Sequence, residues 1–141
     1  MWLITTFGYF SVVQKNADRS AGLVTVRARI RKDLDRLRDR YLPSMGEVDE
    51  GGGKDYPYRV KVSREAMAGA FYEAIMDLDY SNFKAATAAE LGFKREDAYM
   101  QVWLELRKLQ HLDRSADSSA DEASDSGMPM EPATAAANSS T

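Results

Sequence analysis

The sequence predicts an α+β fold, with an antiparallel or mixed sheet of three to four strands and helices packed on one face. Segments rich in aromatic and β-branched residues lie in the first half of the 141-residue chain, and helical apolar periodicity dominates the second half. The two patterns do not alternate as they would in repeated β-α-β units. The expected order is β-β-α-β-α-α-α, and a ferredoxin-like arrangement is the first expectation.

Two strands are predicted at the start of the chain. Residues 2–15 are aromatic and β-branched, with Gly8 at a bulge or bend, so they predict one long strand or two short ones. Residues 16–22 predict a polar turn. Residues 23–30 alternate between apolar and polar side chains, which indicates a half-buried strand paired with the first. The inward side chains of this strand are Val24, Val26, Ala28 and Ile30.

A helix and a third strand follow. Ile30, Leu34, Leu37 and Tyr41 are spaced by four, three and four residues, which predicts a helix that Pro43 ends. Residues 44–54 predict a flexible loop, and residues 55–63 predict a strand. Because proline cannot donate a backbone hydrogen bond, Pro57 indicates that this strand lies at an edge or begins after Pro57. The inward side chains of the strand are Tyr58, Val60 and Val62, and the outward ones are Arg59 and Lys61.

Three helices are predicted after this strand. Ser63 is the expected N-cap of a helix that ends near Asp79. A short helix over residues 80–91 is closed by Gly92, and a last helix covers residues 94–110. The expected buried residues of the first of these helices are Met67, Phe71, Ala74, Ile75 and Leu78, and those of the last are Tyr99, Val102, Trp103, Leu106 and Leu109.

The composition changes sharply near His111, which predicts a single domain over residues 1–112 and a disordered acidic tail over residues 113–141. The tail is rich in Ser, Ala and Asp and has no aromatic residue, so it cannot bury enough surface to offset its ordering entropy. Six acids and one base give the tail a net charge of −5. Because the whole chain carries −3, the predicted domain carries +2.

The chain contains no cysteine, which excludes disulfides, thiolate metal sites and cysteine nucleophiles. The apolar start of the chain has no basic segment before it and is much shorter than the roughly 20 residues that span a bilayer. We therefore expect a cytoplasmic protein without a membrane segment.

The strongest local signal is a basic face on the predicted sheet. If the strand phases are correct, Arg27, Arg29, Arg59 and Lys61 all point away from the core on neighbouring strands. A sheet that carries cations and aromatic rings can bind phosphates and stacked bases. The alternative is an ordinary solvated sheet face, on which Arg and Lys are common.

A second candidate is a tyrosine-rich patch. Tyr56 and Tyr58 precede the basic strand, while Tyr80 and Asn82 follow the first of the three C-terminal helices. If these segments lie side by side, their hydroxyl and amide groups suit a ligand or a protein partner. The alternative is that the rings pack between sheet and helices.

Other motifs carry little chemistry. The loop GEVDEGGGK departs from a phosphate-binding loop at Val48 and Asp55, and it leads from a helix into a strand rather than the reverse. His111 is the only histidine and has no partner motif. We expect no catalytic residue, no metal ligand and no cofactor.

Four segments stand out in order along the chain: TFGYFSVVQK, LVTVRARIRKDLDRLRDRYLP, DYPYR and DLDYSNFK. Together they resemble a group of small uncharacterised bacterial proteins with no assigned activity. The likeness covers about residues 1–110. The resemblance implies a single domain to which the tail is an addition, and it implies no activity, cofactor or partner.

The expected function is that of a non-enzymatic interaction module, which binds protein or nucleic acid through the basic face. The alternative is a small metal-dependent nuclease or phosphotransfer-type hydrolase, in which Glu73, Asp77 and Asp79 hold the metal and the arginines orient phosphate. An exposed strand edge would also allow a homodimer.

Overall fold

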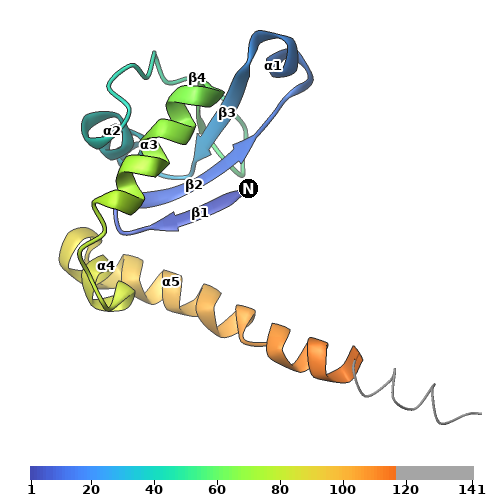
Figure 1. The fold of residues 1–141 in the computed structure, drawn as a ribbon, viewed down its shortest axis with the longest axis vertical. Helices are drawn as coiled ribbons and strands as arrows, with labels where there is room; N and C mark the ends of the chain where they lie inside the picture. Colours follow the sequence, from blue (N-terminus) through green and yellow to red (C-terminus); the bar gives the residue numbers. More distant parts are fainter. Residues whose placement is uncertain (117–141) are drawn as a thin grey trace, which may run out of the picture. The chain divides into compact units, whose positions relative to one another are not determined.

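The computed structural model describes residues 1–116, which form the expected α+β fold with a four-stranded antiparallel sheet (Figure 1). Residues Met1–Val102 form one compact unit, and a second unit begins at Trp103. The strands are β1 (Trp2–Thr5), β2 (Gly8–Val13), β3 (Leu23–Ala28) and β4 (Tyr58–Ser63). The helices are α1 (Asn16–Ala21), α2 (Arg31–Arg40), α3 (Arg64–Met76), α4 (Phe83–Leu91) and α5 (Phe93–Leu106).

The strands pair in sequence order, β1-β2-β3-β4, and every pair is antiparallel. This order confirms that β4 lies at an edge, as Pro57 indicated. It does not by itself show the ferredoxin-like arrangement, which stays a prediction. The first predicted strand is two strands joined at Thr6 and Phe7. Thr5 Oγ1 accepts hydrogen bonds from the amides of Phe7 (3.2 Å) and Gly8 (3.0 Å), which fixes this tight turn.

The core lies between one face of the sheet and helices α2 and α3. Val24, Val26 and Ala28 are buried on this face, as the alternating pattern predicted. Ile30 is 46% exposed and precedes α2 as its N-cap residue, so its predicted inward position is wrong. The helices contribute Leu34, Leu37, Met67 and Ala70 to the same cluster. Burying a Leu or Met side chain stabilises the fold by roughly 1.5–3 kcal/mol.

Helix α1 is the main difference from the predicted elements, because residues 16–22 were expected to form only a turn. Gly22 ends the helix in the left-handed conformation, at φ 66°. The Asp18 carboxylate accepts a hydrogen bond from the Lys15 amide (2.9 Å), which holds the first turn. A six-residue helix held by one buried carboxylate leaves no apolar periodicity in the sequence.

Helix α3 begins after Ser63, as predicted, whereas α4 begins at Phe83 and not at residue 80. Ser63 and Asn82 accept hydrogen bonds from the amides of Ala66 and Ala85, and Gly92 follows α4. The predicted buried face of α3 is only partly correct, because Ile75 is 68% exposed and Leu78 is 52% exposed. Phe71 and Ala74 pack against the core.

No residue of α5 is buried, and Trp103, Leu106 and Leu109 from its predicted stripe are exposed. Within residues 1–116, no helix combines the length and the apolar character that a bilayer crossing requires. Residues 113–116 of the predicted tail are helical, and the rest of the tail prediction lies outside the described residues.

Candidate functional site

The strand register brings the predicted cations onto one face of the sheet, opposite the core. Arg27 lies directly across from Ser11 on β2 and from Arg59 on β4. Thr25 and Lys61 form the next pair on the same face. Their neighbours at the intervening positions, such as Val26 and Val60, are buried in the core. We call this side of the sheet the outer face.

Tyr56 covers part of the outer face. It lies in the segment before β4, is only 7% exposed, and packs its ring beneath two guanidinium groups. The guanidinium carbons of Arg27 and Arg29 lie 4.6 Å and 5.1 Å from its ring centroid. The hydroxyl groups of Tyr56 and Tyr9 are 2.9 Å apart and share a hydrogen bond. The tyrosine ring therefore holds two like charges near each other.

Backbone carbonyl groups, and not a carboxylate, hold the Arg59 side chain; one of them belongs to the glycine segment, residues 51–53. Arg59 Nε donates to the Tyr56 carbonyl (3.3 Å), and its Nη2 donates to the Gly52 carbonyl. A β-carbon at Gly52 would lie 2.6 Å from the Tyr56 carbonyl oxygen and 2.8 Å from Arg59 Cδ, so only glycine fits here. The predicted flexible loop is thus packed onto the sheet at this point. A backbone pair between Asp49 and Arg59 also covers part of the β4 edge.

These residues form a hollow of about 490 Å³, which we call the arginine pocket. Lys54 adds a fourth cation to it, and Asp55 is the acid in its lining. Among the described residues, no carboxylate lies within ion-pair distance of Arg27, Arg29 or Arg59. The pocket is lined by Trp2, Arg27, Arg29, Gly52, Gly53, Lys54, Asp55, Tyr56 and Arg59.

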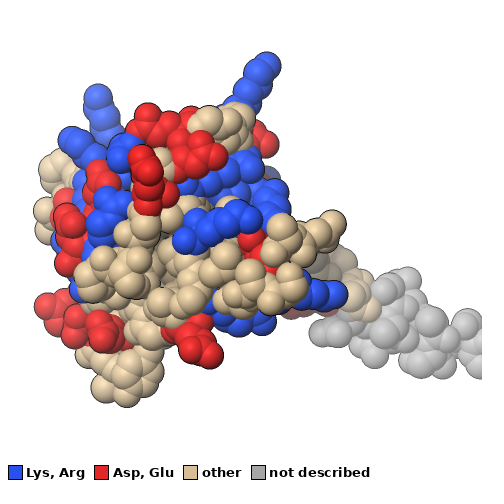
Figure 2. All heavy atoms as spheres, turned by 90° about the horizontal axis from the view of Figure 1, so that it is seen from above, with Lys and Arg blue, Asp and Glu red and all other residues tan. Residues whose placement is uncertain are grey.

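The electrostatic environment of the arginine pocket is positive. Burial raises the pKa of Tyr56, but hydrogen bonds from Tyr9, Arg29 and Ser11 and the charge of Arg29 outweigh it, so that the net pKa is lowered. Burial and the Tyr56 hydrogen bond raise the pKa of Tyr9 to about 12. Arg27 Nε is buried and has no hydrogen-bond partner among the described residues. On the face seen in Figure 2, basic side chains cover a broad area with acidic ones between and beside them, so local pairing is more informative than total charge.

Lys61 differs from the three arginines, although it lies on the same face. Its ammonium group forms an ion pair with the buried Asp18 carboxylate at 2.7 Å, and Thr25 donates to the same carboxylate at 2.7 Å. Hydrogen bonds from Lys61, Thr25 and the Lys15 amide lower the pKa of Asp18 to about 2. Lys61 does not line the arginine pocket, and its contacts hold α1 against the sheet.

The structure does not bring the tyrosine-rich patch together. Tyr58 packs against the core side of the sheet, opposite to Tyr56. Tyr80 lines a different pocket, and Asn82 is the N-cap of α4. Of the four predicted patch residues, only Tyr56 lines the arginine pocket. Tyr56 and Tyr58 are two positions apart, so strand alternation would place both side chains on the same face. The strand begins only at Tyr58, however, and Tyr56 does not follow the alternation.

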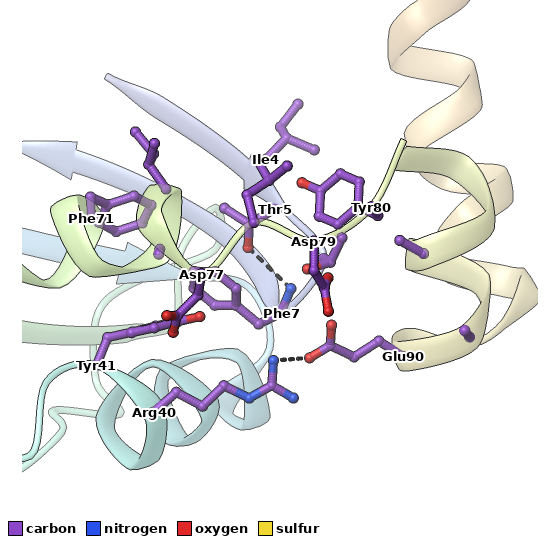
Figure 3. A pocket seen from close by; sticks show the side chains of 16 residues that line it. Ile4, Thr5, Phe7, Arg40, Tyr41, Phe71, Asp77, Asp79, Tyr80 and Glu90 are labelled. Carbon is purple, nitrogen blue, oxygen red and sulfur yellow. Dashed lines mark hydrogen bonds and ion pairs between the residues drawn. The ribbon is translucent and has the colours of Figure 1, made fainter. Parts of the chain in front are cut away.

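The carboxylates of the nuclease alternative lie apart from the arginines. Asp77 and Asp79 line a pocket of about 540 Å³ with Glu90 and Tyr41, and Glu73 is not part of its lining (Figure 3). Arg40 forms an ion pair with Glu90, while burial and the nearby Asp77 raise the pKa of Tyr41. No group of three potential metal ligands occurs within residues 1–116. Glu73, Asp77 and Asp79 therefore do not form the three-ligand group that the metal-dependent alternative assumed.

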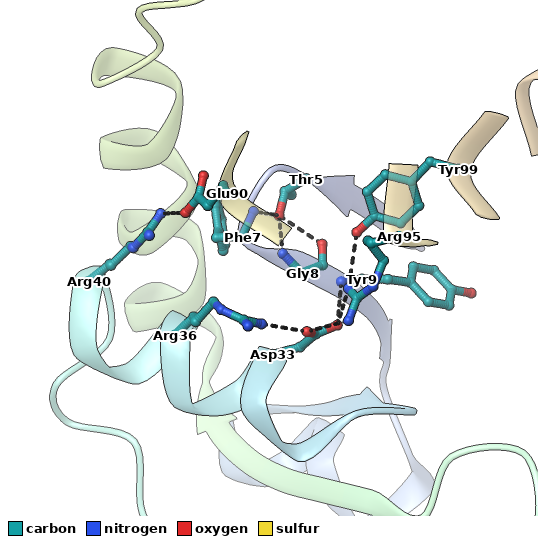
Figure 4. A network of polar contacts seen from close by, with 10 residues as sticks. All are labelled: Thr5, Phe7, Gly8, Tyr9, Asp33, Arg36, Arg40, Glu90, Arg95 and Tyr99. Carbon is teal, nitrogen blue, oxygen red and sulfur yellow. Dashed lines mark hydrogen bonds and ion pairs between the residues drawn. The ribbon is translucent and has the colours of Figure 1, made fainter. Parts of the chain in front are cut away.

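A buried charge network, which the sequence did not indicate, lies beside the outer face. Arg95 donates two hydrogen bonds to Asp33, at 2.8 Å and 3.0 Å, and Arg36 donates a third at 2.9 Å (Figure 4). The Tyr9 amide donates a fourth at 2.9 Å. Burial lowers the pKa of Arg95, but the Asp33 hydrogen bonds outweigh it and raise the net pKa. This network fixes the start of α5 to α2 and β2.

An apolar pocket of about 440 Å³ adjoins this network. Its walls come from the outer face of β1 and β2, from the end of β3 through the start of α2, and from α5. Two of its residues, Trp2 and Arg29, also line the arginine pocket. The complete lining is Trp2, Ile4, Tyr9, Arg29, Ile30, Asp33, Arg95, Ala98, Tyr99 and Val102.

Comparisons with known proteins gave no family model, no curated protein and no solved structure that matches the chain. The resemblance to small bacterial proteins thus stays a prediction.

Proposed function

We propose that this protein is a non-enzymatic binding module that holds a phosphate-bearing ligand in the arginine pocket. The observation that carries the proposal is the grouping of Arg27, Arg29 and Arg59 around Tyr56 without a carboxylate partner in the described chain. By contrast, Arg36, Arg38, Arg40 and Arg95 each form an ion pair.

The arrangement has an energetic cost that an anion would remove. Two guanidinium groups within about 5 Å of one ring centroid repel each other, and solvent screens them less in a hollow than on an open surface. A phosphate accepts two parallel hydrogen bonds from one guanidinium group, which gives both charge neutralisation and geometric specificity. Tyr56 and the glycine segment hold the arginines in place before the ligand arrives.

The proposal includes the cytoplasm as the location, because a chain without cysteine fits a reducing compartment. Bacterial origin and a role in partner binding, with a phosphorylated molecule as the partner, belong to the same proposal. No catalytic step is included.

The proposal is tested by titrating the full-length protein with inorganic tripolyphosphate in a calorimeter at two salt concentrations. We expect binding that weakens at high salt. We expect Arg27→Gln and Arg29→Gln each to weaken it about tenfold, the loss of one charged hydrogen-bonding group.

Lys32→Gln is the matched control, because Lys32 carries the same charge on the exposed side of α2 and does not line the arginine pocket. It should leave the affinity within about twofold of wild type, the change expected from one screened charge. An Arg27→Gln/Arg29→Gln double variant that binds as tightly as the wild type would refute the proposal, as would an equal loss in the control.

A further inference from the structure

We propose that the ligand is a nucleotide unit, whose phosphate occupies the arginine pocket and whose base enters the apolar pocket beside it. This inference rests on the proposed function and adds the chemical class of the ligand. It is carried by the apolar pocket, a site that the sequence did not predict and that the phosphate proposal does not use.

The two pockets form one continuous surface. Trp2 and Arg29 line both of them. Below these two residues, Tyr9 of the apolar pocket and Tyr56 of the arginine pocket join through their hydroxyl groups at 2.9 Å. Trp2 is 69% exposed and packs perpendicular to the Tyr9 ring, with centroids 6.2 Å apart. A ligand that crosses this boundary therefore meets aromatic rings on one side and guanidinium groups on the other.

The lining of the apolar pocket suits a planar ring. Three of its side chains are aromatic, namely Trp2, Tyr9 and Tyr99, and Arg29 presents a guanidinium plane at its border. Bases of single-stranded nucleic acid stack on such rings and planes. Nucleotides carry a base and a phosphate close together, which matches two pockets that share residues.

Asp33, Arg95 and Tyr99, which line the apolar pocket, bond to one another. Both Asp33 oxygens accept hydrogen bonds from Arg95, which in turn lies 3.4 Å from the Tyr99 hydroxyl (Figure 4). These groups are not available to read the edge of a base. Stacking alone accepts any base, so we infer binding with little base preference.

The first test compares ligands on the full-length protein. A Trp103→Phe background leaves Trp2 as the remaining tryptophan of a chain that has two. Adenosine monophosphate should quench Trp2 fluorescence and bind about tenfold more tightly than ribose 5-phosphate, because stacking is worth about one factor of ten or more. Uridine monophosphate should bind within a few-fold of adenosine monophosphate, since stacking strength alone separates them.

The second test fills the apolar pocket. Ala98 is exposed on α5 and lines this pocket, so Ala98→Phe should fold and occupy the space of the base. We expect this variant to lose the roughly tenfold preference for the nucleotide over ribose 5-phosphate that stacking provides. Tripolyphosphate binding should be unchanged. The ligand comparison on the unmodified pocket decides the question even if Ala98→Phe does not fold.

The outcomes separate the two proposals. Equal affinities for adenosine monophosphate and ribose 5-phosphate, with Arg29-dependent binding of tripolyphosphate, overturn the base site and leave the proposed function standing. Failure of every phosphate ligand to bind overturns both. A short oligothymidylate strand identifies the source: tighter binding than the mononucleotide, reduced by Ala98→Phe, indicates single-stranded nucleic acid, and equal or weaker binding indicates a free nucleotide. Both of these results support a nucleotide unit.

Discussion

The Asp33 network and the arginine pocket both place arginines beside the same sheet, but they differ in what balances the charge. At Asp33, two arginines and one backbone amide satisfy a carboxylate that is 2% exposed at its side chain. In the arginine pocket, an aromatic ring and backbone carbonyls hold the arginines, and no described carboxylate pairs with them. Charges that are matched within the chain stabilise the fold, whereas charges left unmatched are available to a ligand.

The largest expected effect comes from removing the acid at the centre of the matched network. Asp33→Ala leaves Arg95 partly buried without its partner, so we expect the free energy of unfolding to fall by about 3–5 kcal/mol. Urea denaturation measures this loss. Asp35→Ala on the same helix is the control, because its ion pair with Arg38 spans 3.5 Å at an exposed position and should contribute less than about 1 kcal/mol. Equal losses in the two variants would contradict the assigned role of Asp33.

The close packing around Asp33 gives the next largest effect. A β-carbon at Gly8 would lie 2.7 Å from Asp33 Cβ and 2.8 Å from Phe10 Cζ. Gly8→Ala must therefore displace the carboxylate or the ring, and we expect a loss of about 1–3 kcal/mol in urea denaturation. Gly46→Ala is the control, since a β-carbon there meets no atom within 4 Å. A loss in Gly8→Ala no greater than in this control would show that the contact relaxes freely.

Asp18 makes the matched charges sensitive to pH. Its pKa falls from 3.8 to about 2 on folding. Its contribution to the free energy of unfolding is therefore complete above about pH 4 and is lost as the pH drops toward 2. We expect the stability of the wild type to decline in this interval more steeply than that of Asp18→Asn. Urea denaturation at a series of pH values compares the two slopes. Parallel curves between pH 4 and pH 2 would contradict the assignment.

The smallest expected effect on stability lies in the arginine pocket. Arg29 is exposed and forms no ion pair within residues 1–116, so Arg29→Gln should change the free energy of unfolding by no more than about 0.5 kcal/mol. The same variant is expected to weaken phosphate binding. A large loss of stability without a loss of phosphate binding would contradict the assignment of Arg29 to ligand binding.

The strands and their phases were predictable because they follow period-two alternation in β-branched segments. This pattern placed Arg27 and Arg59 on one face, and the register confirms it. Pro57 and Ser63 likewise marked an edge strand and a helix start. At these positions, the residue and its neighbours in sequence were sufficient to predict the local structure.

The remaining features depend on contacts between distant residues. Asp33 and Arg95 are 62 positions apart, and neither lies in a motif. Lys61 resembled the arginines in the sequence, but its partner Asp18 lies 43 positions away in a helix that has no apolar periodicity. The packing of the glycine segment onto Arg59 was also invisible, since glycine runs are equally common in mobile loops. Whether a surface charge is matched within the chain can be read only from the three-dimensional structure.

The pairing of Asp33 with Arg95 also has a consequence for the order of folding. The four strands pair with their neighbours in sequence, and the longest connection between paired strands covers residues 29–57, whereas the Asp33–Arg95 contact joins residues 62 positions apart. We expect the sheet to be organised in the folding transition state and α5 to dock afterwards. Replacing Arg95 with Met should then accelerate unfolding and leave the refolding rate nearly unchanged. The contact between Asp33 and Arg95, which forms last, would thus determine the lifetime of the native state.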